Sequence, residues 1–489
     1  MNVSAAPGLP ASPPASPRFH YAWVIAGVTF VVLIAAAGVR SVPSVLIVPL
    51  EEEFGWSRAT VSLAVSINLL LFGLLGPFAA SLMERVGVRR MMVAALSTLT
   101  VAVGLTTQMN QPWQLMLFWG GLVGLGAGAM SGWLSATVST RWFVKRRGVV
   151  VGALTAAGAT GQLIFLPMLA RIVESAGWPP AVALVAVTIA LVVPLVALLM
   201  RNSPADRGLL PYGATSAADV PAVRPQTANP FKAAIEMLVT SVRDRNFRFL
   251  ALSFFICGAS TNGLIGTHLI PMAHDHGLTE VTAASLLALI GVFDIMGTMG
   301  SGWLSDRYDN RRLLWWYYSL RGLSLLFLPF AFAAGVPGLA IFVVFYGLDW
   351  VATVPPTVRL TGDLFGVQRV GTVFAWMLAS HQLGASMAAY AAGAMRTSLG
   401  DYRLTFLIAG ALCLVAGMLV MQINRSTTDE NGNVSIIRST PRARLSSGTR
   451  AMFFGSAAAT GLAVVTLLIT RPAQVASAAE DVLVWCGLR

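Results

Sequence analysis

The sequence predicts an all-α polytopic membrane protein made of two pseudo-symmetric six-helix bundles. Three observations lead to this prediction. The 489 residues are 56% hydrophobic and only 11% charged, which is too apolar for a soluble core with a conventional polar surface. Long apolar runs recur along the chain, and a helix of ~20 such residues crosses a bilayer with every backbone amide paired internally. A short polar string also occurs twice, 222 positions apart, each time between apolar runs.

Twelve apolar runs are candidate membrane spans. They begin near residues 21, 58, 91, 112, 148, 179, 247, 280, 313, 337, 370 and 402. The chain accordingly divides into a disordered cytoplasmic tail (1–20), an N-terminal six-helix bundle (21–201), a cytoplasmic linker (202–246), a C-terminal six-helix bundle (247–424) and a basic tail (425–489). The first segment is rich in Pro, Ala and Ser and lacks the charged start and apolar centre of a cleavable signal.

Two further segments lie outside the twelve spans. In the linker, Asn229 and Pro230 favour the start of an amphipathic helix that ends near Arg243, which we interpret as a surface helix tying the halves together. In the basic tail, residues 451–470 form another apolar run long enough to cross a bilayer. A thirteenth span and a peripheral tail both remain open for that run.

The basic residues of the connections predict the orientation. Nineteen Lys and Arg up to Arg369 fall on the side of the N-terminus, against four on the other side, namely Arg58, Arg171, Arg396 and Arg403. The positive-inside rule therefore predicts a cytoplasmic N-terminus. We expect the protein to lie in the inner or plasma membrane of the cell. The same bias accounts for the net charge of +12, so we expect no nucleic-acid partner.

The repeated string relates the two halves over a long distance. At the offset of 222, the matched residues include Pro49 and Pro271, Gly55 and Gly277, and Ser57 and Thr279. Further on the offset rises by one, so that Gly161 matches Gly384. Two related six-helix halves can rock against each other around a central site, which is the alternating-access geometry of transporters with internal repeats.

These residues also resemble a known family. The second copy contains Gly302, Asp306, Arg307, Arg311 and Arg312 and resembles the cytoplasmic loop signature of the major facilitator superfamily, with Asp309 where that signature usually has Gly. The first copy is similar, with Glu84 and Arg85 in the positions of Asp306 and Arg307. The strings Phe54-Gly55-Trp56-Ser57-Arg58 and Ser380-His381-Gln382-Leu383-Gly384-Ala385 resemble the branch of monocarboxylate-transporter-like and oxalate/formate-antiporter-like members. The resemblance covers about residues 20–425 and implies a transporter fold.

The signature residues are candidates for a gate at the cytoplasmic end. A carboxylate at a helix end can bond nearby guanidinium groups and face the positive end of another helix. We therefore expect Glu84, Arg85, Asp306 and Arg307 to form a latch that breaks when this end opens. The alternative is that the arginines only enforce topology.

Arg40 is the candidate for substrate binding in the N-terminal half. An ionisable side chain in hydrocarbon costs at least ~2.5 kcal/mol, so each one is a candidate functional residue. Arg40 lies deep in the first span and pairs under the repeat with Asn262, which follows Thr261 in the seventh. A guanidinium suits a carboxylate bidentately. The alternative is that Arg40 snorkels outward.

The C-terminal half supplies the candidates for proton coupling. Asp294 and Asp349 lie near the middle of their spans, and a carboxyl group buried without a cation could carry a proton. The alternatives are a hydrogen bond to a neighbouring helix or, for Asp294, an ion pair with Arg321. His381 and Gln382 could accept a proton or bond a substrate, or be bonded between helices.

A few other residues complete the set. Tyr346 and Trp350 flank Asp349 and are candidates for the cavity wall. Arg359 and Asp363, one turn apart, are predicted to form a structural ion pair.

The distribution of charges favours anionic cargo, because the N-terminal half has only Arg40 at membrane depth. We therefore expect a secondary active transporter of small organic anions, monocarboxylates first, by proton symport or anion exchange. An exporter of amphipathic compounds and a non-transporting membrane receptor are the alternatives. The sequence contains no nucleotide loop, metal-spaced cluster or nucleophile elbow, so we expect neither an enzyme nor a cofactor or metal. The expected partners are the anion, protons and the bilayer. We expect the protein to be a monomer.

Overall fold

The computed structural model describes residues 20–130, 133–214, 229–366, 369–424, 426–428 and 434–436. The tail 1–20, apart from His20, lies outside the described residues, as does the apolar run 451–470.

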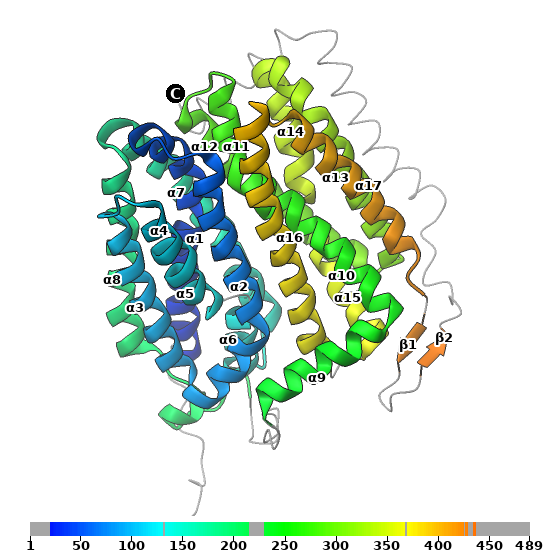
Figure 1. Cartoon of the computed structure of the whole chain (residues 1–489). Coiled ribbons are helices and arrows are strands. Elements are labelled where there is room, and N and C mark those ends of the chain that lie inside the picture. Colours follow the sequence, from blue (N-terminus) through cyan, green and yellow to red (C-terminus); the bar gives the residue numbers. More distant parts are fainter. Residues whose placement is uncertain are drawn as a thin grey trace, which may run out of the picture.

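Helices make up most of the described chain (Figure 1). The first group comprises α1 (Tyr21–Phe54), α2 (Arg58–Val86), α3 (Val88–Thr106), α4 (Pro112–Leu115), the π-helix η1 (Met116–Val123), α5 (Gly124–Gly128), α6 (Trp133–Trp142), α7 (Arg147–Ala176), α8 (Trp178–Leu199) and the 3-10 helix η2 (Pro204–Arg207). The second group comprises α9 (Pro230–Arg243), α10 (Arg245–Gly258), the π-helix η4 (Ala259–Ile265), α11 (Gly266–Asp275), α12 (Glu280–Ser305), α13 (Asn310–Ala333), α14 (Gly335–Asp349), α15 (Val354–Phe365), α16 (Val370–Leu399) and α17 (Arg403–Met421).

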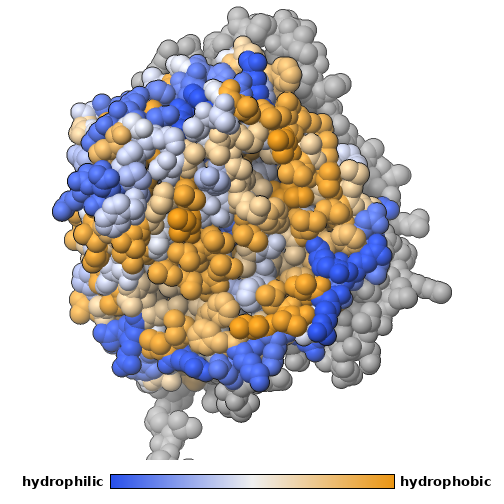
Figure 2. Space-filling model, in the orientation of Figure 1, coloured by the Kyte–Doolittle hydropathy of each residue, from blue (hydrophilic) through white to orange (hydrophobic). Residues whose placement is uncertain are grey.

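The predicted helical architecture is confirmed. Each predicted span start lies within three residues of the first residue of a helix. Within the described residues, nine helical segments are long and apolar enough to cross a membrane. Apolar side chains cover much of the middle of the molecule, and hydrophilic ones gather at its two ends (Figure 2). The all-α prediction omits one small feature, a two-stranded antiparallel ribbon of β1 (Ser426–Thr428) and β2 (Val434–Ile436).

The internal repeat is visible in the helix ends. Gly55 and Gly277 follow α1 and α11, and both have positive φ, which a residue with a Cβ rarely adopts. Ser57 and Thr279 cap α2 and α12 in the same way, each side chain accepting a hydrogen bond from the backbone N–H three residues later. Helices α7 and α16, which match at an offset of 223, both have 30 residues.

The two groups lie side by side, the first in blue to cyan and the second in green to orange (Figure 1). They meet along two seams, where α2 packs against α16 and α7 packs against α12. The repeat makes these seams equivalent, because α2 corresponds to α12 and α7 to α16. One end of the molecule holds Arg58 and is called here the predicted outer end; the other holds Arg89 and is the predicted cytoplasmic end.

Helix α9 lies across the predicted cytoplasmic end and touches both groups (Figure 1). It begins where the sequence predicts, because Asn229 accepts a hydrogen bond from the backbone N–H of Phe231. The Phe231 ring stacks on Phe78 of α2 at 5.6 Å between centroids. Trp376 of α16 donates its indole N–H to the Ala234 carbonyl at 2.9 Å. Helix α9 therefore contacts both groups, as a helix that ties the halves together would.

Candidate functional site

Arg40 lies in the interior of α1, which continues as an α-helix to Phe54 in spite of Pro43 and Pro49. Its side chain is exposed, whereas Val39 and Ser41 on either side are buried. Among the described residues it has no hydrogen bond and no ion pair. Its guanidinium lies against α7, because a Cβ added at Gly158 would stand 3.2 Å from Nη2. The site therefore offers an unpaired cation.

Asn262, the repeat partner of Arg40, lies in the π-helix η4 and is half-buried. Such π-helical turns are rare and occur frequently at functional sites. Its neighbour Thr261 is buried and donates its hydroxyl to the Cys257 carbonyl at 2.7 Å. The Thr261 hydroxyl is thus used in a hydrogen bond within its own helical segment. The Asn262 amide side chain, in contrast, has no hydrogen bond within the described residues.

Asp349 is paired with Arg321, and the premise that it is buried without a cation is wrong. Arg321 Nε lies 2.6 Å from Asp349 Oδ2, and the two side chains are 0% and 6% exposed. Arg321 also donates to the carbonyls of Asp349 and Trp350 and to the Cys257 sulfur. The ion pair ties α13 to α14 and α10 in the interior of the second group.

Asp294 is partly buried in α12 and is not paired with Arg321, so that alternative is wrong. Its Oδ1 accepts hydrogen bonds from the Thr298 hydroxyl and the Val351 N–H, both at 2.9 Å. These bonds place Asp294 beside the junction of α14 and α15. Among the described residues it forms no ion pair.

His381 and Gln382 are buried on α16, with 8% and 3% of their surfaces exposed. Phe254 of α10 packs against the imidazole at 4.8 Å between centroids, and Gly73 of α2 lies against the Gln382 side chain. Neither His381 Nδ1 nor Gln382 Oε1 has a hydrogen-bond partner within the described part of the chain. Gln382 thus sits in the seam between the two groups.

Tyr346 and Trp350 surround the buried ion pair rather than an open site. Tyr346 is fully buried and donates its hydroxyl to the Ser260 carbonyl at 2.7 Å. Trp350 is half-buried and packs edge-on against Tyr346. Tyr346 therefore stiffens the contact of α14 with η4.

The predicted latch is only partly described. Asp306 is exposed and forms no ion pair among the described residues. Arg307 bonds the Trp303 carbonyl, and Arg85 lies over the Phe231 ring at 5.9 Å. The side chain of Glu84 is outside the described residues.

The departure at Asp309 has a structural reason. Asp309 caps α13 by accepting a hydrogen bond from the Arg311 backbone N–H and also pairs with the Arg311 guanidinium.

The predicted ion pair of Arg359 and Asp363 is confirmed, at 3.9 Å on the surface of α15.

An ion network at the predicted outer end escaped the sequence analysis. Arg58 at the start of α2 pairs with Asp275 at the end of α11, and Asp275 pairs with Arg396 of α16. Arg58 also pairs with Glu51. The motif Trp56-Ser57-Arg58 drew attention to this arginine, but its partner comes from the other half of the chain.

The predicted residues therefore fall into separate places. Thr261, Tyr346, Asp349 and Trp350 gather around Arg321 and η4 in the second group, and Gly258 joins this region to His381. Arg40 lies on the other side, between α1 and α7. No hydrogen bond or ion pair within the described residues joins Arg40 to Asn262 or to the candidate acids.

Two repeated groups of apolar helices around two equivalent seams define a multi-span membrane transporter. A family model described as Major Facilitator Superfamily matches residues 28–357 and, a second time, residues 250–475. The chain belongs to this superfamily, whose members are transporters and not enzymes.

Relatives and solved structures agree with this assignment. The chain is 24% identical over 411 residues to the uncharacterized MFS-type transporter YcxA of Bacillus subtilis, covering 82% of this chain and 93% of the relative. It is 26% identical over 439 residues to monocarboxylate transporter 11 of Mus musculus, covering 85% and 90%. A D-xylose-proton symporter has a TM-score of 0.64 at 15% identity, covering 82% of this chain and 98% of that one. A bacterial homologue of the human lysosomal transporter Spinster, in an inward-facing and occupied conformation, also has a TM-score of 0.64 at 15% identity, with 82% and 97% covered. At these identities the two solved structures show the fold alone.

Proposed function

We propose that this protein is a secondary active carrier of small organic anions, above all monocarboxylates, and that it works by alternating access. The observation that carries the proposal is the guanidinium of Arg40, which extends from α1 against α7 and has no partner among the described residues. Relatives named as monocarboxylate transporters support the substrate class. We place the protein in the inner or plasma membrane with its N-terminus in the cytoplasm.

The depth of Arg40 argues against a role at the membrane surface. With a rise of 1.5 Å per residue, Arg40 lies ~21 Å along the axis from Phe54 and ~28 Å from Tyr21. An arginine side chain reaches only several ångströms, so Arg40 does not extend to either end of α1. A cation held at that depth is costly in hydrocarbon, and a carboxylate solute can compensate its charge through two parallel hydrogen bonds.

Asp294 is the best candidate for the coupling proton. Asp349 is neutralised by Arg321, whereas the partners of Asp294 among the described residues are a hydroxyl and a backbone N–H. Asp294 also lies on α12, which forms a seam with α7, the helix that carries Gly158 beside Arg40. Protonation of Asp294 and binding of an anion to Arg40 would therefore both affect the seam between α7 and α12. His381 and Gln382 remain candidates for substrate contact in the other seam.

Uptake into proteoliposomes tests the proposal. A panel of labelled monocarboxylates, with and without an inward proton gradient, should show saturable uptake of at least one acid. Arg40→Ala should abolish uptake with normal membrane insertion, Arg40→Lys should retain part of it, and the surface variant Arg359→Ala should behave as the wild type. Normal uptake by Arg40→Ala would remove the binding assignment.

Two further measurements separate the alternatives. Asp294→Asn should keep exchange of labelled for unlabelled acid but lose accumulation driven by the proton gradient; undiminished accumulation would refute its coupling role. Binding of an acid without counterflow would identify a receptor, and uptake of amphipathic cations without acids would identify an exporter of such compounds.

A further inference from the structure

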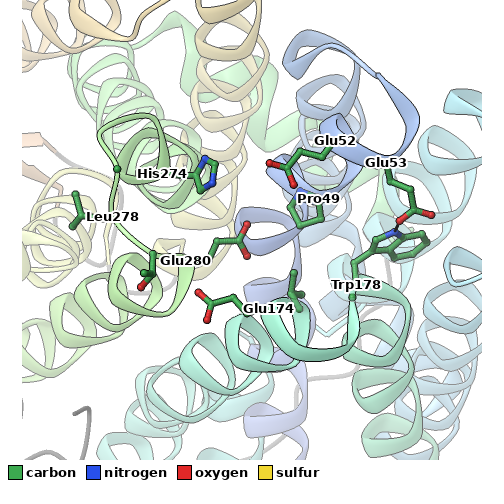
Figure 3. A pocket seen from close by; sticks show the side chains of 12 residues that line it. Pro49, Glu52, Glu53, Glu174, Trp178, His274, Leu278 and Glu280 are labelled. Atoms are coloured by element: carbon green, nitrogen blue, oxygen red, sulfur yellow. Dashed lines mark hydrogen bonds between the residues drawn. The ribbon is translucent and has the colours of Figure 1, made fainter.

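A cavity of about 720 Å³ opens at the predicted outer end (Figure 3). Its walls come from both halves, because α1, α7 and α8 line one side and α11 and α12 the other. This volume is typical of sites for small organic molecules. The cavity is distinct from the surroundings of Arg40, and the proposed function does not use it.

Four acidic side chains line the cavity. Glu52 and Glu53 come from the end of α1, Glu174 from α7 and Glu280 from α12, and His274 adds an imidazole. Among the described residues that line the cavity, none is Lys or Arg. The protein as a whole carries a net charge of +12, so this acidic surface opposes the overall charge.

Two of the four carboxylates have partners. Glu53 accepts a hydrogen bond from the Trp178 indole at 2.6 Å. Glu174 accepts one from the backbone N–H of Val281 at 3.1 Å, and this bond crosses from one half to the other. Glu52 is exposed toward the cavity.

Glu280 is the exception that points to a ligand. Only 8% of its surface is exposed, and its Oε2 atom has no hydrogen-bond partner among the described residues. Its carboxylate is directed into the space between Glu174 and Glu52 (Figure 3). A buried carboxylate oxygen without a donor is costly, and two further carboxylates beside it add repulsion. A cation with N–H groups would remove both costs.

We propose that this cavity binds an organic cation that carries two or more ammonium groups. Each ammonium has three donors and can bond carboxylates from opposite walls. The carboxylates are spread around a space much larger than a single ion, and the described residues contain no group of three ligands placed to hold a metal. Leu278 and Pro49 supply apolar contacts for the methylene chain between the ammonium groups. Because the acids belong to both halves, the bound cation holds the predicted outer end closed.

Spermidine is a suitable probe. The purified full-length protein is titrated with spermidine at constant, high ionic strength, with heat of binding and thermal shift as readouts. We expect saturable binding and a higher melting temperature. Glu280→Gln and Glu174→Gln should each weaken binding about tenfold or more, since each removes a charge-assisted hydrogen bond. Glu236→Gln, an exposed acid of α9 at the opposite end, is the matched control and should leave binding unchanged.

The outcomes are decisive in both directions. Equal affinity of the wild type and Glu174→Gln for spermidine overturns the proposal, and this variant alters an exposed side chain, so it decides the question even where Glu280→Gln folds poorly. Failure to detect saturable binding overturns it too. Stabilisation by Mg²⁺ at matched ionic strength that equals the effect of spermidine would mean a divalent-cation or screening effect and also refutes an ammonium site. None of these measurements depends on Arg40 or on the transported anion.

Discussion

Arg58 and Asp275 form a bidentate ion pair, with Nη1 to Oδ2 at 2.8 Å and Nη2 to Oδ1 at 2.7 Å. Arg58 belongs to the first half of the chain and Asp275 to the second. The Arg58 side chain is only 5% exposed and that of Asp275 17%. Within the described residues this is the one ion pair that joins the halves, and it lies at the predicted outer end.

Asp275→Asn should destabilise the closed outer end. The change leaves the buried Arg58 with Glu51 as its only carboxylate, and removal of one partner from a buried pair costs about 3 kcal/mol. The variant should show a lower melting temperature and faster labelling of a cysteine introduced at Ala59, beside the seam. A melting temperature and labelling rate equal to those of the wild type would show that the pair does not hold this end.

Asp349→Asn should destabilise the second half through Arg321. Arg321 is completely buried, so loss of its counter-charge costs ~3–5 kcal/mol, far more than loss of an exposed pair. Replacement of both residues, Arg321→Met with Asp349→Leu, should restore much of the stability because no unpaired charge remains. Glu236→Gln, which breaks only the exposed contact with Lys232, should change stability by less than ~0.5 kcal/mol. Equal melting temperatures of Asp349→Asn and Glu236→Gln would contradict the assignment.

Gly158→Leu should impair the proposed anion site without unfolding the protein. The new side chain would extend from a Cβ only 3.2 Å from Arg40 Nη2 and would displace the guanidinium. We expect a higher KM for the transported acid at near-normal expression. Gly152→Leu on the same helix is the control, because no neighbouring atom lies within 4 Å of its Cβ position. A KM that rises equally in both variants would mean that the effect is not exerted through Arg40.

Gly384→Ala should be strongly destabilising. An added Cβ would overlap the Phe255 carbonyl of α10, which belongs to the backbone and cannot rotate away. The cost should reach about 3 kcal/mol, the upper range for overpacking. Gly371→Ala in α16 meets nothing within 4 Å and should be neutral or stabilising, because alanine favours helix by ~1 kcal/mol. Similar melting temperatures of the Gly384→Ala and Gly371→Ala variants would contradict this explanation.

The sequence was sufficient for the features that depend on local chemistry. Apolar runs placed the helix starts, and Asn229 marked the start of α9. The repeat predicted the equivalence of α7 and α16, because the same residues recur at the same separation.

The ion pairs and hydrogen bonds between helices could not be predicted from the sequence. The sequence leaves Arg321 open as a partner for Asp294, but in the fold Arg321 pairs with Asp349. The partner of Arg58 is 217 residues away, and Glu280 gave no signal as the first residue of a span. Such contacts depend on how helices turn toward one another, which apolar periodicity does not specify.

The position of α9 makes the two seams unequal at the predicted cytoplasmic end. There α9 stacks on α2 through Phe231 and accepts a hydrogen bond from Trp376 of α16. Within the described residues, Gly148 and Gly152 of α7 and Gly300 and Gly302 of α12 have no neighbouring atom within 4 Å of their Cβ positions. Among the described residues, α9 therefore covers the seam between α2 and α16 at this end but not the seam between α7 and α12. A solute that passes this end would therefore move between α7 and α12. The two groups of helices would pivot about the seam between α2 and α16.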